Sequence, residues 1–416
     1  MFRQNLVLFA GGLVAGFGSF VFHAIAGRML GPAAYGQVAF LIAVYAVGAT
    51  LAVVVSLLVA RHTSRMVARG DSAIVRSLIT AAMPPIGIAC VLALLVTALL
   101  ARSVAAFEHI RSSVPVLLLG LCVAMGWQVA LPRGILQGLQ RFRALALNFA
   151  LEPVVRVGAL VLLLISGYSV SGAIAALFAG LGFCLLIGFY SLRDTFAPGG
   201  PPARLRVMAG FSVTAVAGIV GIQLLFNQDV ILAEHYLPSH LGGIYGGLNK
   251  IGTILFYLTL SVSQVLFPRV VEAVEKDHHP GRILLSSVGI VAALGAGALL
   301  IFAWLPGLVV AVLYGASFRD ATPYVLAVGV IGLALSLNNL LVQFFMAVHD
   351  LWFVPILAAG CIGEAALIVL FHATLWHVVA DVLAALVGLL ILLSVRCYLL
   401  LPTLRAGAGA RPEPSL

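Results

Sequence analysis

Long apolar stretches separated by short connections are the feature that most constrains how this chain can fold. A helix needs about 20 apolar residues to cross a hydrocarbon core of about 30 Å, and twelve stretches of the chain are that long. They lie near residues 5–26, 38–60, 78–101, 114–132, 144–166, 172–191, 207–233, 244–266, 283–305, 321–346, 352–373 and 375–400. Only 9% of the 416 residues are charged, whereas soluble domains carry about a quarter. The sequence therefore predicts an all-α, polytopic membrane protein.

A weak internal repeat indicates how the twelve helices are grouped. Tyr35-Gly36 recurs as Tyr245-Gly246 at an offset of 210, and the polar turn 138–142 falls opposite 348–352 at the same offset. We therefore expect two six-helix bundles over residues 1–200 and 201–401 that enter the membrane from the same side. The Pro/Gly/Ala-rich tail over residues 402–416 is predicted to be disordered.

The distribution of Lys and Arg predicts the orientation in the membrane. On one side the connections and termini carry seventeen Lys and Arg residues, and on the other side they carry four. The richer side includes a predicted basic turn with Arg133, Arg141 and Arg143. Because cytoplasmic loops are enriched in Lys and Arg, both termini are predicted to be cytoplasmic. The net charge of +9 is spread over many connections, so it indicates membrane topology and no nucleic-acid partner.

The fifth stretch contains two charges within a predicted span. Glu152 and Arg156 lie one helical turn apart beside Pro153, which removes a backbone donor and is expected to kink the helix. Two interpretations are open. The residues form an ion pair that braces the helix, or Arg156 faces a wet cavity while Glu152 holds it in place or exchanges a proton.

Further polar residues lie near one end of the seventh and eighth stretches. Asn227 and Asp229 belong to the first of these, and Asn249 and Lys250 to the second. Charges inside a bilayer are costly, so we expect these side chains to face the bundle interior or a water-filled cleft. Asp229 either pairs with Lys250 across the hairpin or faces an ion or a substrate.

Glu364 and Asp381 are the other acids predicted within spans. His372 and His377 lie near them, so the four residues either form a proton relay or place both histidines at the surface.

Signals for catalysis, metals or cofactors are weak. The five cysteines lie in or beside predicted helices without CxxC spacing, and we interpret them as small apolar residues. His278-His279 lies in a charged loop that we interpret as solvated, and the other histidines lack zinc spacing. We expect no metal site, no cofactor, no ATP-binding loop and no enzymatic activity.

Four segments together resemble a known family. They are GRMLGPAAYGQ (27–37), LQGLQRFRALALN (136–148), LGGIYG (241–246) after the helix with Asn227 and Asp229, and VLFPRV (265–270). Their order and spacing are similar to those of the polysaccharide-export branch of the multidrug/oligosaccharidyl-lipid/polysaccharide (MOP) exporter superfamily, which includes O-antigen flippases. The likeness is strongest over the first eight helices.

The resemblance implies a MATE-like pair of bundles around a central cavity, in the bacterial inner membrane. It implies alternating access that moves an undecaprenyl-diphosphate-linked oligosaccharide between leaflets, with membrane lipids and other polysaccharide-assembly proteins as partners. Candidate cavity residues are Arg28, Arg156, Lys250, Asn227 and Asn249. Candidates for H⁺ or Na⁺ coupling, or for charge pairing, are Glu152, Asp229, Glu364 and Asp381.

Two other functions fit parts of the pattern. A cation-coupled multidrug antiporter of the same fold would be favoured by a cavity richer in carboxylates than in cations. A membrane-bound glycan polymerase or ligase would need a substantial outer loop with catalytic residues, and the outer connections here are short and thinly polar.

Overall fold

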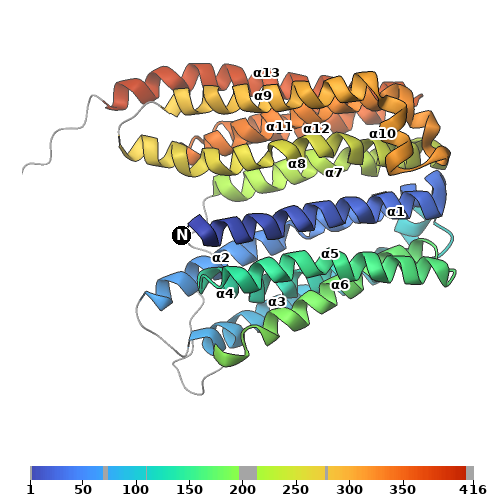
Figure 1. The fold of residues 1–416 in the computed structure, drawn as a ribbon, viewed down its shortest axis with the longest axis horizontal. Coiled ribbons are helices and arrows are strands. Elements are labelled where there is room, and N and C mark those ends of the chain that lie inside the picture. Colours follow the sequence, from blue (N-terminus) through green and yellow to red (C-terminus); the bar gives the residue numbers. More distant parts are fainter. Residues whose placement is uncertain (1, 69–73, 109, 196–212, 277–279, 409–416) are drawn as a thin grey trace, which may run out of the picture. The chain divides into compact units, whose positions relative to one another are not determined.

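The computed structural model describes the chain except residues 1, 69–73, 109, 196–212, 277–279 and 409–416. Throughout the described part, the secondary structure is helical (Figure 1). Two compact units, Met1–Phe211 and Ser212–Leu416, divide the chain. The boundary predicted between residues 200 and 201 lies outside the described residues.

The first unit contains helices α1 to α6, coloured blue to green in Figure 1. Their bounds are α1 Phe2–Gly48, α2 Thr50–Val67, α3 Ile74–Phe107, α4 Val114–Gly138, α5 Phe142–Ile165 and α6 Val170–Tyr190, followed by the 3₁₀ helix η1, Arg193–Thr195. The second unit contains α7 Val213–Tyr236, α8 Ser239–Glu275, α9 Pro280–Trp304, α10 Pro306–Leu313, the 3₁₀ helix η2 Ala316–Tyr324, α11 Val325–Ala347, α12 Phe353–Leu370 and α13 Leu375–Ala408.

α1 contains a sharp break at Gly31. This residue has φ 73° and ψ 171°, a conformation that is essentially restricted to glycine. Pro32 follows and suits the first turn of a new helix, where its missing N–H costs nothing. Gly31 therefore separates the first predicted span from the second, which covers the end of α1 and continues into α2.

The described residues contain 11 helical segments long and apolar enough to cross a membrane. The first, Gly11–Val67, has 57 residues, and a straight helix of that length would measure about 85 Å. Because it breaks at Gly31, it supplies two spans, and the predicted all-α fold with twelve membrane-spanning helices is confirmed for the described residues.

Three local predictions were wrong. Arg133 does not lie in a loop, because α4 continues to Gly138 and leaves only residues 139–141 as the turn. The tail predicted to be disordered from residue 402 continues as helix to Ala408, since leucine and alanine around Pro402 favour helix. Ahead of α11, Pro306 and Gly315 produce the separate elements α10 and η2, neither of which was predicted.

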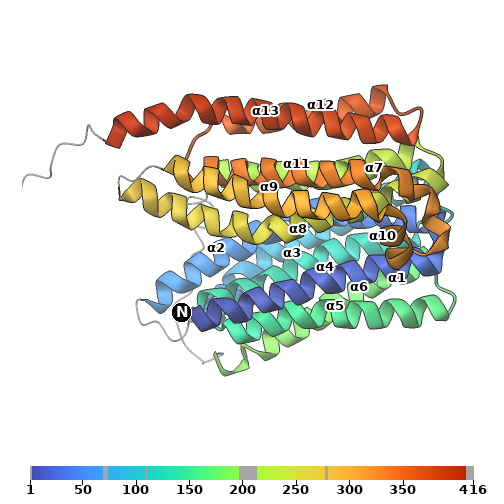
Figure 2. The ribbon, with the colours of Figure 1, turned by 45° about the horizontal axis from the view of Figure 1, so that its top comes forward.

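The same pairs of helices are in contact in both units. Counting Gly31 as the first boundary, the fifth helix contacts the first and the sixth, and the fourth contacts the second, third and sixth. In the second unit these contacts join α12 to α7 and α13, and α11 to α8, α9 and α13. Figure 2 shows α12 beside α13. This shared contact pattern supports the predicted internal duplication.

The turn between the fourth and fifth helices also recurs. Gln140 (φ 57°) and His349 (φ 56°) are both left-handed. In each turn the next residue donates its backbone N–H to a carbonyl five residues earlier, Arg141 to Leu136 (2.9 Å) and Asp350 to Phe345 (3.1 Å). These equivalent positions are 209 residues apart, one fewer than the predicted offset.

A bidentate ion pair joins each turn to its own unit, to η1 after α6 in the first unit and to α13 in the second. The Arg141 guanidinium donates to both carboxylate oxygens of Asp194, at 2.7 and 2.9 Å, which lowers the pKa of that carboxyl. In the second unit the Arg396 guanidinium donates to Asp350, at 3.0 and 2.5 Å. The turn thus supplies the arginine of the pair in the first unit and the aspartate in the second.

Candidate functional site

A small cavity lies within the second unit between α7, α8, α11 and α13. Asp229, Tyr245, Asn249 and Thr253 supply its polar lining. Its volume is about 20 Å³, which is about the space that one water molecule needs. Its remaining lining residues are Leu225, Gly252, Val328, Ile331, Gly332, Leu335, Val382 and Leu386.

Asp229 is the buried charge of this cavity. Its Oδ2 accepts hydrogen bonds from the Tyr245 hydroxyl at 2.7 Å and from Asn249 Nδ2 at 2.8 Å. Its Oδ1 and the Oδ1 of Asn249 have no hydrogen-bond partner among the described residues. A buried polar atom without a partner costs about 1–3 kcal/mol, so these two oxygens favour a small polar guest.

The backbone of α8 sets the position of both donors. Tyr245 and Asn249 are four residues apart, so they lie on one face of the helix. That face meets α11 at two glycines, where a Cβ on Gly252 would lie 2.7 Å from the Val328 carbonyl oxygen. A Cβ on Gly332 would overlap the carbonyl of Gly252. Only glycines allow this close approach of the two helices beside Asp229.

Among the described residues, Asp229 and Lys250 do not form an ion pair within 4.0 Å. Asp229 is held by Tyr245 and Asn249 instead, although Lys250 is near enough for the two charges to attract each other. Lys250 is partly buried. Of the two alternatives for Asp229, a direct ion pair with Lys250 is therefore not among the described contacts.

Glu364 on α12 lies near Asp229 and is fully buried. Its Oε2 accepts a hydrogen bond from Gln228 Nε2 at 2.9 Å, and the same amide donates to the Cys361 carbonyl at 3.1 Å. Gln228 precedes Asp229 on α7, and the two carboxylates are close enough to repel each other when both are charged. The second unit therefore brings together two of the four predicted coupling residues.

The predicted relay of Glu364 and Asp381 with two histidines is not formed by the described contacts. His372 bonds the Ile368 and Val369 carbonyls and stacks on Tyr236 at 4.3 Å. His377 is exposed and bonds Thr374. Asp381 is partly buried one turn after His377. The surface interpretation of His377 fits this placement.

The Glu152–Arg156 ion pair predicted in the first unit is present. Arg156 NH1 lies 3.3 Å from Glu152 Oε1, and the two side chains are 12% and 16% exposed. The Arg156 guanidinium also lies 5.0 Å from the centre of the Phe22 ring of α1. Gly180 of α6 packs against the same pair. These contacts join three helices, as expected for a bracing pair.

Arg133 takes part in a buried polar cluster that the sequence did not reveal. Its Nε donates to Asn148 Oδ1 at 2.8 Å, and its guanidinium lies 4.6 Å from the centre of the Phe149 ring. Asn148 in turn donates to the Cys184 carbonyl at 2.8 Å. The buried asparagine within an apolar span was the available signal.

The remaining predicted residues lie apart from the cavity. Asn227 is buried and donates to the Gln223 carbonyl of its own helix at 2.8 Å. Arg28 is exposed three residues before the break at Gly31. All five cysteines are free and buried, as predicted, whereas His278-His279 lies outside the described residues.

A family model for polysaccharide biosynthesis proteins matches residues 2–274. The chain belongs to the polysaccharide biosynthesis protein family. The match ends one residue before the end of α8, so it covers the part where the sequence motifs lie. A search of curated proteins found no match to this member of the family.

Solved structures confirm the fold of this polysaccharide biosynthesis family protein. An inward-facing multidrug resistance MATE family transporter of the MOP superfamily is 12% identical with a TM-score of 0.74, over 97% of this chain and 98% of that chain. The lipid II flippase MurJ, in an inward closed conformation, is 11% identical with a TM-score of 0.68, over 98% and 91%. The eukaryotic MATE transporter AtDTX14 is 12% identical with a TM-score of 0.67, over 98% and 99%.

Proposed function

We propose that the protein is a flippase that moves an undecaprenyl-diphosphate-linked oligosaccharide across the bacterial inner membrane by alternating access, for surface polysaccharide biosynthesis. The observation that carries the proposal is the family match over residues 2–274. The full-length likeness in fold to a lipid II flippase supports it. A diphosphate-sugar headgroup cannot cross about 30 Å of hydrocarbon unaided, so the protein must replace its hydration with polar groups.

Cationic side chains are the candidates for the diphosphate. Arg28 is exposed and Lys250 has no ion-pair partner within 4.0 Å among the described residues. Arg156 is already paired with Glu152, so binding there would require that pair to open. Asn227 and Asn249 remain candidates for the sugar, although both amides already donate within the protein.

A cation-coupled multidrug antiporter is the second candidate. The proximity of Asp229 and Glu364 favours it, because neighbouring buried carboxylates attract protons or sodium ions. The same pair also suits H⁺ or Na⁺ coupling of a flippase. Other polysaccharide-assembly membrane proteins are proposed partners.

Flipping in proteoliposomes tests the proposal. The purified protein is reconstituted with a fluorescent polyprenyl-diphosphate sugar, with and without a proton or sodium gradient, and the lipid that becomes accessible to a membrane-impermeant quencher is measured. We expect protein-dependent flipping. Uptake of a cationic dye without movement of the lipid would assign the antiporter function instead.

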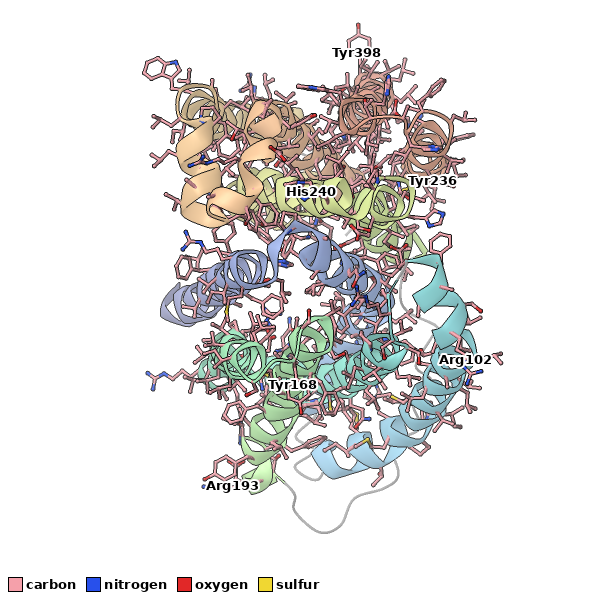
Figure 3. The ribbon with its side chains drawn as sticks, turned by 90° about the vertical axis from the view of Figure 1, so that its right-hand side faces the viewer. Arg102, Tyr168, Arg193, Tyr236, His240 and Tyr398 are labelled. Carbon is pink, nitrogen blue, oxygen red and sulfur yellow. The ribbon has the colours of Figure 1, made fainter. Side chains whose placement is uncertain are left out.

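Two alanine variants test the cationic residues in the same assay. Lys250→Ala or Arg28→Ala should lower flipping several-fold at equal protein abundance. Arg102→Ala is the matched control, because Arg102 is an exposed arginine of the first unit (Figure 3). Unchanged flipping in both variants would remove these residues from the site while leaving the flippase proposal intact.

A further inference from the structure

α10 is a short apolar helix at the end of α9 (Figure 1). Its eight residues extend about 12 Å, which is too short to cross a membrane. Pro306 at its start cannot continue the helical hydrogen bonding of α9, so the chain changes direction there. One face of α10 is buried in the second unit through Val310 and Leu313. The next residue, Tyr314, is also buried.

The opposite face of α10 is exposed and apolar. Leu308 and Val312 lie on it. The surface continues through Leu305 onto the last turn of α9, where Trp304 is 81% exposed and Ile301 is also exposed. Because α9 is one of the segments able to cross a membrane, the apolar face of α10 extends a surface that already faces hydrocarbon.

The exposed side chains become polar directly after α10. Ser317, Arg319 and Asp320 of η2 are exposed, whereas Phe318 is buried and stacks on Tyr314 with ring centres 4.7 Å apart. Apolar and polar exposure therefore meet within a few residues. Such a change is typical of an element that lies in the membrane interface.

We infer that α10 lies in the interface of the leaflet where α9 leaves the membrane, with Leu308 and Val312 in the acyl chains and η2 in water. The ligand of this face is a lipid surface. Trp304 fits the same depth, because tryptophan is enriched where hydrocarbon meets headgroups.

This placement connects the lipid surface to α8. The rings of Tyr314 and Phe318 pack against Gly247, which lies between Tyr245 and Asn249 on α8. At the start of α8, His240 Nε2 lies 3.2 Å from Asp320 Oδ2 of η2 (Figure 3 labels His240). The segment formed by α10 and η2 thus supports the end of α8 that carries Tyr245 and Asn249, the two donors to Asp229.

Spin labels test the inference in liposomes. Single cysteines replace Leu308, Val312, Ser317 or Arg319 and are labelled with a nitroxide, and power saturation compares its collisions with oxygen and with a water-soluble nickel chelate. Oxygen concentrates in the acyl chains and the chelate in water. We expect the oxygen-to-nickel ratio at positions 308 and 312 to be several-fold higher than at 317 and 319.

Two outcomes would overturn the inference. Equally low oxygen-to-nickel ratios at all four positions would place α10 in water, and low accessibility to both reagents at 308 and 312 would assign the face to a protein contact. The protein without an introduced cysteine, treated with the same reagent, is the background control, because its five cysteines are buried. Each labelled variant is first compared with the unlabelled protein in thermal unfolding.

Discussion

Tyr245 and Asn249 both donate hydrogen bonds to one oxygen of Asp229. Removing one of these donors should therefore lower the stability of the protein. Tyr245→Phe deletes the hydroxyl and leaves the buried carboxylate with one donor. A hydrogen bond to a charged group contributes about 1.5–3 kcal/mol, so we expect a loss of stability of that order. Thermal unfolding in detergent micelles measures it.

Tyr398→Phe is the control for this experiment, because Tyr398 is exposed and points away from α13 (Figure 3). It should leave thermal unfolding unchanged. Equal stability of both variants would mean that the Tyr245 hydroxyl does not stabilise Asp229.

The Glu152–Arg156 pair predicts strong coupling between two substitutions. Removing one partner of a fully buried ion pair costs about 3–5 kcal/mol, because the other charge stays buried and unpaired, and less is expected here because the two side chains are 12% and 16% exposed. We expect Glu152→Gln and Arg156→Leu each to be destabilising, and the double variant to lose much less stability than the sum. Additive losses in thermal unfolding would contradict the bracing role.

Glu108 predicts a pH dependence of stability. It is buried between α3 and α4, outside the membrane-spanning segments, and burial raises its pKa from 4.5 to about 8. The folded carboxyl therefore keeps its proton after the unfolded carboxyl has lost it, and its contribution to stability is full below pH 4.5 and lost as the pH rises through about 8. We expect the melting temperature to fall over this range.

The slope should be smaller in Glu108→Gln, because the amide does not titrate. Glu272→Gln should keep it, since Glu272 is exposed on α8 and pairs with Lys276. A slope that survives in Glu108→Gln would assign the pH dependence to another group.

The sequence predicted which polar residues lie within spans, but not how they pair. Asp229 and Asn249 are hydrogen-bonded to each other inside the second unit, as expected for polar side chains within spans. The partner of Asp229 depends on which face of α8 meets α7, and the glycine contact between Gly252 and Gly332 determines that face. Arg133 was placed in a loop because an arginine near the end of an apolar stretch looks the same in sequence whether it binds Asn148 or water.

At the level of elements, the two turn ion pairs differ in burial and predict different sensitivities. The Asp350 side chain is 7% exposed and the Asp194 side chain 62%. Loss of the Asp350 carboxylate would leave the Arg396 charge partly buried, whereas exposed pairs contribute little. Asp350→Ala should therefore lower the melting temperature, and Asp194→Ala should hardly change it. The opposite order would mean that burial does not govern these turns.

Most helices were predictable from apolar length alone, and the exceptions have local causes. The first two spans follow each other without a loop, because Gly31 and Pro32 turn the chain inside α1, and the second span continues from α1 into α2. α10 was missed because its apolar residues are too few to register as a span, and η2 because its residues are mostly polar and were read as part of a connection.

For the whole molecule, the excess of Lys and Arg on one side predicts which helix ends face the cytoplasm. Arg143 and Ser112 are exposed near opposite ends of α4. A cysteine at Arg143 should react with a membrane-impermeant maleimide only in inverted vesicles, and a cysteine at Ser112 only in intact cells with a permeable outer envelope. The reverse pattern would invert the proposed topology.

The exchanged charges of the two turns bear on how a duplicated chain assembles correctly. Two units with the same helix order offer each sixth helix two similar docking places during folding. A sixth helix docked in the other unit would bring a charge of the same sign toward the turn, Arg396 toward Arg141 or Asp194 toward Asp350, which disfavours the exchange. The opposite polarity of the two ion pairs therefore favours docking of each sixth helix in its own unit.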